Sequence, residues 1–183
     1  MHHKARRAIK GANIYLTGMM GSGKTTLGRL LSQKLGCPFA DTDELIEART
    51  NCSIAQLFRE QGEAHFRDLE TATLLELNQK RGWVVSLGGG AVLREVNRHA
   101  IQAAGYSIYL KVSPETILAR LPEHPGRPLL LGTDLPERLH LIEKLLAARE
   151  PYYLQADSVI ENGGSPDETI GKILKELRGA DLL

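Results

Sequence analysis

Gly-Met-Met-Gly-Ser-Gly-Lys-Thr, residues 18–25, matches the pattern G-x-x-x-x-G-K-T at every fixed position. A short apolar stretch at 13–18 precedes this loop, and leucines recur at helical spacing from 24 to 35 behind it. Glycines let successive backbone N–H groups point into one anion-sized hollow, and the following helix N-terminus adds partial positive charge. The loop with its two flanks predicts a nucleoside triphosphate site, and we expect ATP with Mg²⁺.

Two side chains of the loop are expected to bind the nucleotide and its metal ion. Lys24 should reach the β- and γ-phosphates, and the Thr25 hydroxyl should ligate Mg²⁺. The expected nucleotide contacts in the loop are Gly21, Ser22, Gly23, Lys24, Thr25 and Thr26. The acceptor of the phosphoryl group stays open at this point, between water, a protein, a nucleotide and a small metabolite. The chain has no N-K-x-D motif, which disfavours GTP, and its small size favours a small acceptor.

Outward from the loop, short apolar stretches alternate with helical patterns. We expect strands at 13–18, 39–41, 83–87, 106–112 and 158–160, and helices at 24–35, 43–49, 53–61, 63–81, 95–104, from 114, 139–149 and 166–177. Asp43 is the expected N-cap of the helix at 43–49. This alternation predicts an α/β fold in three α/β/α layers around a parallel five-stranded sheet. The expectation is one P-loop domain over 1–183 with its core at about 12–178.

Composition and charge narrow the class of protein. The chain has 183 residues, 42% hydrophobic residues and a formal net charge of +1. These values exclude collagen-like, wholly disordered and disulfide-scaffold proteins, and give no general attraction to nucleic acid or membrane. Two cysteines without a C-x-x-C spacing, and no apolar run of about 18 residues, favour a cytoplasmic protein. The sequence shows no pattern that indicates a subunit interface, and we expect a monomer.

Acidic and glycine-rich segments follow the next two expected strands. Asp41-Thr42-Asp43 ends the second strand, and Gly88-Gly89-Gly90 follows the third. Ligands of open α/β sheets bind at the carboxyl ends of strands. One carboxylate near Mg²⁺ and one near a substrate hydroxyl is a sensible division, although both could simply cap a helix. The glycines permit close approach of backbone to ligand, although they could also form a flexible turn.

Three arginines stand beside aromatic residues or prolines. Arg67 follows Phe66, Arg127 precedes Pro128, and Arg149 lies in Arg-Glu-Pro-Tyr-Tyr at 149–153. Scattered arginines are usually solvated, but a positioned guanidinium grips a planar carboxylate with two hydrogen bonds. The segment 121–136 is rich in Pro and Gly and has no period, so we expect a mobile lid there.

Together these motifs resemble the shikimate kinase family, which has the nucleoside-monophosphate-kinase-like P-loop fold. The resemblance covers about residues 12–175. The matching segments are Gly-Met-Met-Gly-Ser-Gly-Lys-Thr-Thr at 18–26, Asp-Thr-Asp at 41–43, Phe-Arg-Asp-Leu-Glu at 66–70, Gly-Gly-Gly-Ala-Val at 88–92, Arg-Pro-Leu-Leu at 127–130 and Arg-Glu-Pro-Tyr-Tyr at 149–153. The P-loop alone is common to many families, whereas this combination is far more specific.

The resemblance implies roles for the acceptor side, with acceptor-binding helices in the region of about 42–70. Asp43 would bind shikimate hydroxyls as a base or only orient the reacting one, and Asp41 would hold water on Mg²⁺. Arg67 and Arg149 would grip the shikimate carboxylate. The remaining implied acceptor contacts are Glu70, which would orient Arg67, the backbone of Gly88, Gly89 and Gly90, and an apolar wall of Phe58 and Phe66.

On the nucleotide side, the resemblance implies that Arg127 closes over ATP from the lid. Arg120 and the loop reaching Pro166 would sandwich the adenine. The chain departs from the family pattern at 162–165, which lacks a second arginine sometimes seen near adenine. The implied catalytic set is Lys24, Asp43 and Arg127, and the implied reaction is ATP + shikimate → ADP + shikimate 3-phosphate.

Two other interpretations remain. Another small-metabolite P-loop kinase, such as a gluconate kinase, would share the loop and the lid, but not the arginine pair with Gly-Gly-Gly-Ala. A non-catalytic ATP-binding regulator or nucleic-acid partner could use the same scaffold. The near-neutral charge and the complete set of expected catalytic residues disfavour it.

Overall fold

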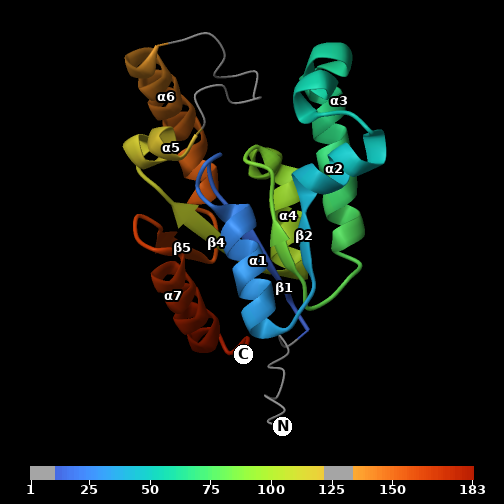
Figure 1. Cartoon of the computed structure of the whole chain (residues 1–183). Helices are drawn as coiled ribbons and strands as arrows, with labels where there is room; N and C mark the ends of the chain where they lie inside the picture. The colour runs from blue at the N-terminus through green and yellow to red at the C-terminus, as the bar shows by residue number, and fades with distance from the viewer. Residues whose placement is uncertain (1–10, 122–133) are drawn as a thin grey trace.

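A computed structural model describes residues 11–121 and 134–183. Five parallel strands form one sheet in the order β2-β3-β1-β4-β5 (Figure 1). The strands are β1 Asn13–Thr17, β2 Phe39–Asp41, β3 Val84–Ser86, β4 Gly105–Lys111 and β5 Ser158–Glu161. The helices are α1 Lys24–Leu35, α2 Thr42–Thr50, α3 Ile54–Leu77, α4 Glu95–Ala104, α5 Pro114–Arg120, α6 Leu135–Tyr153 and α7 Pro166–Gly179, with a 3₁₀ turn η1 at Ala91–Leu93.

Both faces of the sheet are covered by helices, which confirms the predicted three layers. Side chains alternate along a strand, so Ile14 and Leu16 pack with α1 and α7 on one face. Tyr15 packs on the other face, in a core to which α3, α4 and α6 contribute. All five strands were expected within one or two residues of their observed ends.

Helix ends differ more from the sequence expectations. Asp41, not Asp43, is the N-cap of α2, because its Oδ1 accepts the backbone N–H groups of Asp43 at 3.0 Å and Glu44 at 3.3 Å. The prediction that Asp43 caps this helix was wrong. The Asp43 side chain instead lines cavities at the carboxyl ends of the strands. The two helices expected at 53–61 and 63–81 form one element, α3, with non-helical backbone at Gly62.

The carboxyl ends of the strands lie at one edge of the sheet, where the P-loop follows β1. Figure 1 shows α5 and α6 on one side of this edge and α2 with the first part of α3 on the other. Most of the segment expected to be a lid, 121–136, including Arg127, lies outside the described residues. Within the part of the chain that the structure describes, no helix is long and apolar enough to cross a membrane.

Candidate active site

The P-loop forms a hollow of about 190 Å³ at the carboxyl end of β1. Gly21 and Gly23 have φ values of 74° and 86°, which are costly for any residue with a side chain. Lys24 is buried, and its Nζ donates to the carbonyls of Gly18 and Met19 at 2.9 Å each. The lysine therefore lies against the loop that lines the hollow, and backbone N–H groups of such a loop suit a phosphate.

Thr25 and Asp41 meet on one wall of this hollow. The Thr25 hydroxyl donates to Asp41 Oδ2 at 2.7 Å, while the other carboxylate oxygen caps α2. A hydroxyl and a carboxylate beside a phosphate hollow suit Mg²⁺, which takes few protein ligands and completes its shell with phosphate and water. Across residues 11–121 and 134–183, no cluster of three or more His, Cys, Asp or Glu side chains could hold a metal by itself.

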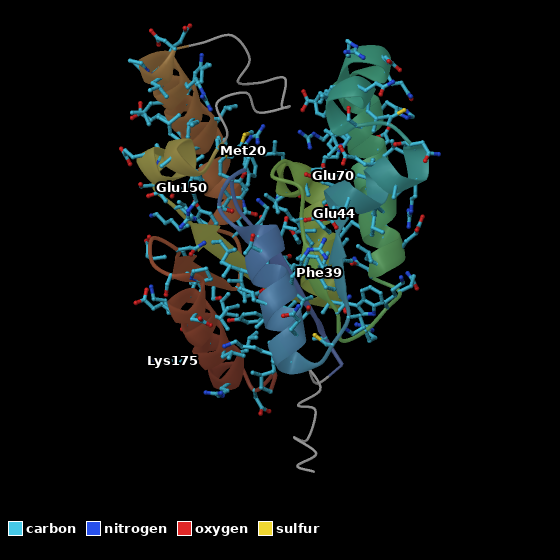
Figure 2. The ribbon with its side chains drawn as sticks, in the orientation of Figure 1. Met20, Phe39, Glu44, Glu70, Glu150 and Lys175 are labelled. Atoms are coloured by element: carbon cyan, nitrogen blue, oxygen red, sulfur yellow. The ribbon has the colours of Figure 1, made fainter. Side chains whose placement is uncertain are left out.

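A second, larger cavity of about 490 Å³ adjoins the phosphate hollow. The two share Met20, Thr25, Asp41, Asp43 and Gly89 in their walls. Met20 lines the larger cavity from the P-loop, and Glu70 lines it from α3; Figure 2 labels both. Asp43 therefore lies where a group bound in one cavity would meet a group bound in the other.

Arg67 and Glu70 form an ion pair in the wall of the larger cavity. Arg67 Nη1 lies 2.8 Å from Glu70 Oε2, and Arg67 Nη2 lies 3.0 Å from the exposed carboxylate of Glu63. Burial alone would lower the pKa of Arg67, but the charges and hydrogen bonds of the two glutamates raise it. Burial raises the pKa of Glu70, Arg67 offsets part of that rise, and the charge of Asp43 adds to it.

The glycine triplet leaves room for these charged groups. A Cβ on Gly88 would lie 2.5 Å from both Asp43 Oδ1 and Glu70 Oε1, and one on Gly90 would overlap the Arg67 guanidinium. Side chains at these two positions would displace the charged groups. At Gly89 a Cβ would make only ordinary contacts, so that glycine is not required by packing.

Arg149 reaches the same cavity from α6. It is 9% exposed, and its guanidinium hydrogen-bonds the Tyr153 side chain one turn along the helix. The Tyr153 hydroxyl donates to the Gly89 carbonyl at 2.6 Å. Burial raises the pKa of Tyr153, against the lowering effect of Arg149. Two arginines from different helices thus line one cavity, an arrangement that suits a bound carboxylate.

Phe58 and Phe66, which were expected to form an apolar wall, lie against each other. Their ring centroids lie 4.8 Å apart, and the Arg67 guanidinium stands 5.8 Å and 5.2 Å from the two rings. Both rings line the larger cavity.

The residues expected near adenine lie on the other side of the P-loop. Arg120 ends α5 and donates to the Asn162 carbonyl at 3.1 Å, and Pro166 begins α7. Thr26 lines the phosphate hollow. Arg127 lies outside the described residues, so its expected place over ATP has no structural counterpart here.

Two residues of this region had no expected role. The sequence places Tyr153 in the motif at 149–153 without a role of its own, and it predicts no role for Asn162. Asn162 sits in Glu-Asn-Gly-Gly, which reads as a turn, so nothing in the local sequence signals its contact with a loop 140 residues earlier.

A parallel sheet with a P-loop, a phosphate hollow and an adjoining acceptor cavity defines a P-loop kinase of a small molecule. The family model described as shikimate kinase matches residues 20–178. A shikimate kinase of Synechococcus sp. (strain JA-3-3Ab) is 47% identical over 81% of this chain and 77% of its own length. One of Pseudomonas syringae pv. syringae is 44% identical over 86% of this chain and 91% of its own length.

A solved structure agrees with these sequence matches. Shikimate kinase from Acinetobacter baumannii, in complex with shikimate, superimposes with a TM-score of 0.88 at 36% identity, over 95% of this chain and 97% of that one. The chain belongs to the shikimate kinase family. It is accordingly an ATP-dependent kinase.

Proposed function

We propose that this protein transfers the γ-phosphoryl group of ATP to the 3-hydroxyl of shikimate, giving ADP and shikimate 3-phosphate. The observation that carries the proposal is the join between the phosphate hollow and the larger cavity, with Asp43 in both walls. An acceptor hydroxyl beside Asp43 would stand next to the terminal phosphate of a nucleotide in the P-loop. The binding of shikimate reported for the Acinetobacter baumannii relative agrees with this proposal.

Phosphoryl transfer depends mainly on positioning and on neutralising charge. The P-loop amides and Lys24 would hold the phosphates, with Lys24 exchanging its contacts to the Gly18 and Met19 carbonyls for phosphate oxygens. Asp43 would accept a hydrogen bond from the 3-hydroxyl, orient it, and take its proton as the new bond forms. Arg127, from the segment outside the described residues, would add positive charge over the nucleotide.

Thr25 and Asp41 fit a Mg²⁺ ion, as their oxygen atoms and their shared wall of the hollow indicate. When bound, Mg²⁺ would neutralise negative charge on the β- and γ-phosphates. Asp41 meanwhile keeps α2 in place through its cap, which fixes the backbone that carries Asp43.

The acceptor end would be recognised by charge and shape. Arg67 and Arg149 enter the larger cavity from α3 and α6 and suit the carboxylate of a rigid ring acid. Phe58 and Phe66 would pack against the ring, and the Gly89 N–H would face it. Glu70 would hold Arg67 in its orientation through the 2.8 Å contact.

The experiment is an assay of ADP release with Mg-ATP, comparing shikimate, quinate and gluconate at equal concentration. The proposal predicts release that depends on shikimate. Release with gluconate but not shikimate would instead indicate another metabolite kinase. It would also contradict the proposed binding of the shikimate carboxylate by Arg67 and Arg149. No acceptor-dependent release of ADP, with ATP still bound by the protein, would favour a non-catalytic role.

Three further expectations accompany the proposal. We expect a monomer that works in the cytoplasm and takes small molecules rather than nucleic acid or membrane as partners. Size-exclusion chromatography with light scattering would test the monomer, for which the mass of one chain is 20.1 kDa.

A further inference from the structure

Asn162 follows β5 directly and connects that strand to the P-loop. Its side chain is buried, and Nδ2 donates to the Ser22 carbonyl at 2.7 Å. Asn162 does not line the phosphate hollow, so it contacts the loop from behind.

A second contact supports the orientation of the Asn162 amide. The buried hydroxyl of Thr169, on α7, donates to Asn162 Oδ1 at 2.8 Å. The Ser22 carbonyl can only accept, so the amide must present its NH₂ group to the P-loop, which leaves Oδ1 to accept from Thr169. The backbone of Asn162 is also held, since its N–H donates to the Lys111 carbonyl at 2.8 Å.

The contact with Ser22 bears on the phosphate hollow because a peptide unit is planar and trans. The Ser22 carbonyl and the Gly23 N–H belong to one peptide unit and point in opposite directions. A carbonyl held by Asn162 from behind the loop therefore turns the Gly23 N–H away from Asn162. Gly23 lines the hollow, so its N–H is set for a phosphate oxygen.

We propose that Asn162 is a positioning residue for the phosphates of the nucleotide. It holds the Ser22–Gly23 peptide in the orientation that binds phosphate and does so without touching the nucleotide. The proposal rests on the ATP binding inferred above. It extends the site from the P-loop to the start of α7, where Thr169 completes the support.

Loss of the Asn162 side chain should act on the P-loop and spare the adenine side. Arg120 donates to the backbone carbonyl of Asn162, which Asn162→Ala retains. In the variant, the buried Ser22 carbonyl loses its donor, and its peptide is free to rotate. Such a loss is equivalent to roughly a tenfold change in affinity.

Asn13 supplies a matched control for a purely structural role. It is also fully buried, donates to the Lys80 carbonyl at 3.1 Å, and accepts the Trp83 N–H at 3.0 Å. It begins β1, at the opposite edge of the sheet from the P-loop. Asn13→Ala should lower Tm and leave both ligand affinities unchanged.

The test is calorimetric titration of Asn162→Ala, Asn13→Ala and wild type with ADP and, separately, with shikimate. We expect the Kd for ADP to rise about tenfold in Asn162→Ala while the Kd for shikimate stays within about twofold. An unchanged Kd for ADP would overturn the proposal, and so would an equal weakening of both ligands in both asparagine variants. Failure of wild type to bind ADP would instead contradict the proposed function.

A second variant keeps the test decisive if Asn162→Ala does not fold. Thr169→Val removes only the hydroxyl that orients the amide and preserves the shape of the side chain. We expect a smaller rise in the Kd for ADP, about threefold, and a smaller ADP-induced shift of the Gly23 amide in ¹H–¹⁵N spectra than in wild type. A wild-type Gly23 shift together with a wild-type Kd would overturn the proposal.

Discussion

The position of the Asp43 side chain depends on Gly88, because glycine has no side chain that would occupy the same space. Gly88 leaves room for the carboxylates of Asp43 and Glu70, because a Cβ there would lie 2.5 Å from an oxygen of each. Asp41 takes over the capping of α2, so Asp43 is not needed for that task. Asp41 thus caps α2 and Glu70 pairs with Arg67, while Asp43 is left for the acceptor contact proposed above.

Asp43→Asn preserves shape and removes the charge that would receive the hydroxyl proton. We expect kcat to fall by about 100-fold to 10,000-fold, with the Kd for ADP nearly unchanged. The measurement is steady-state kinetics with shikimate beside titration with ADP. Asp68→Asn is the control, because Asp68 pairs with Arg94 on the exposed side of α3. Equal turnover of Asp43→Asn and Asp68→Asn would rule out the role of Asp43.

Tyr153→Phe removes the hydroxyl that donates to the Gly89 carbonyl and keeps the ring, which stacks 5.1 Å from Tyr109. We expect the KM for shikimate to rise several-fold, the KM for ATP to stay unchanged, and a loss of about 1 kcal/mol of stability. Tyr106→Phe, at the far end of β4, should change neither KM. An altered KM for ATP alone would show that Tyr153 does not support the acceptor side.

Glu70 gives a prediction about pH. Burial raises its pKa in the folded protein, so the folded state holds the Glu70 proton more tightly than the unfolded state does. The contribution of neutral Glu70 is complete below its unfolded pKa and is lost as pH rises through the folded pKa. The free energy of unfolding of wild type minus that of Glu70→Gln should therefore decrease with rising pH. Denaturant unfolding across acidic to neutral pH measures this difference, and an increase would contradict the assignment.

At single positions, the sequence predicted residues that belong to contiguous motifs. Lys24 and Asp41 line the phosphate hollow and Arg67 lines the larger cavity, because each motif is one local turn or helix. No role could be predicted for Asn162 and Tyr153, because their partners, Ser22 and Gly89, lie far away in the chain. Only the folded sheet brings these residues together.

At the scale of elements, α3 is divided at Gly62. Its φ of 81° and ψ of 167° place it in a region that only glycine occupies readily, and a Cβ there would touch nothing within 4 Å. The break allows the first part of α3, with Phe58, to lie over the cavity while the second part packs on the sheet. Glycine is required here by backbone conformation alone.

Gly62→Ala should therefore destabilise the protein by about 1–3 kcal/mol through backbone strain. Gly171 is the matched control, since it lies exposed inside α7 and a Cβ there also meets nothing within 4 Å. Gly171→Ala should instead stabilise by about 0.5–1 kcal/mol. Thermal unfolding of the two variants measures both effects. A higher Tm for both variants would show that the backbone at Gly62 is not strained by alanine.

The existence and type of the elements followed from the sequence, but some of their ends did not. α6 runs from Leu135 to Tyr153, well beyond the expected 139–149, because Asp134 caps its start. Its later turns contain Pro151, which reads as a helix stop in isolation. The side chains of Ile142, Leu146 and Tyr153 pack into the core, and this packing stabilises the helix past Pro151.

For the whole molecule, the alternation of strands and helices predicted the layers but not the order of the strands. β1 is central and pairs with β3 and β4, so segments far apart in sequence meet at its carboxyl end. This order places the P-loop between the acceptor helices on one side and α5 with α7 on the other. The larger cavity and the residues that support the P-loop near α5 and α7 therefore both depend on this order of strands.

The most direct measurement is ³¹P NMR of the wild-type protein incubated with Mg-ATP and shikimate. The account predicts one phosphomonoester, on the 3-hydroxyl of shikimate, formed in equal amount with ADP. Inorganic phosphate in place of that ester would mean that the joined cavities deliver the phosphoryl group to water. That result would contradict the central claim that Asp43 and the two arginines hold the acceptor beside the P-loop.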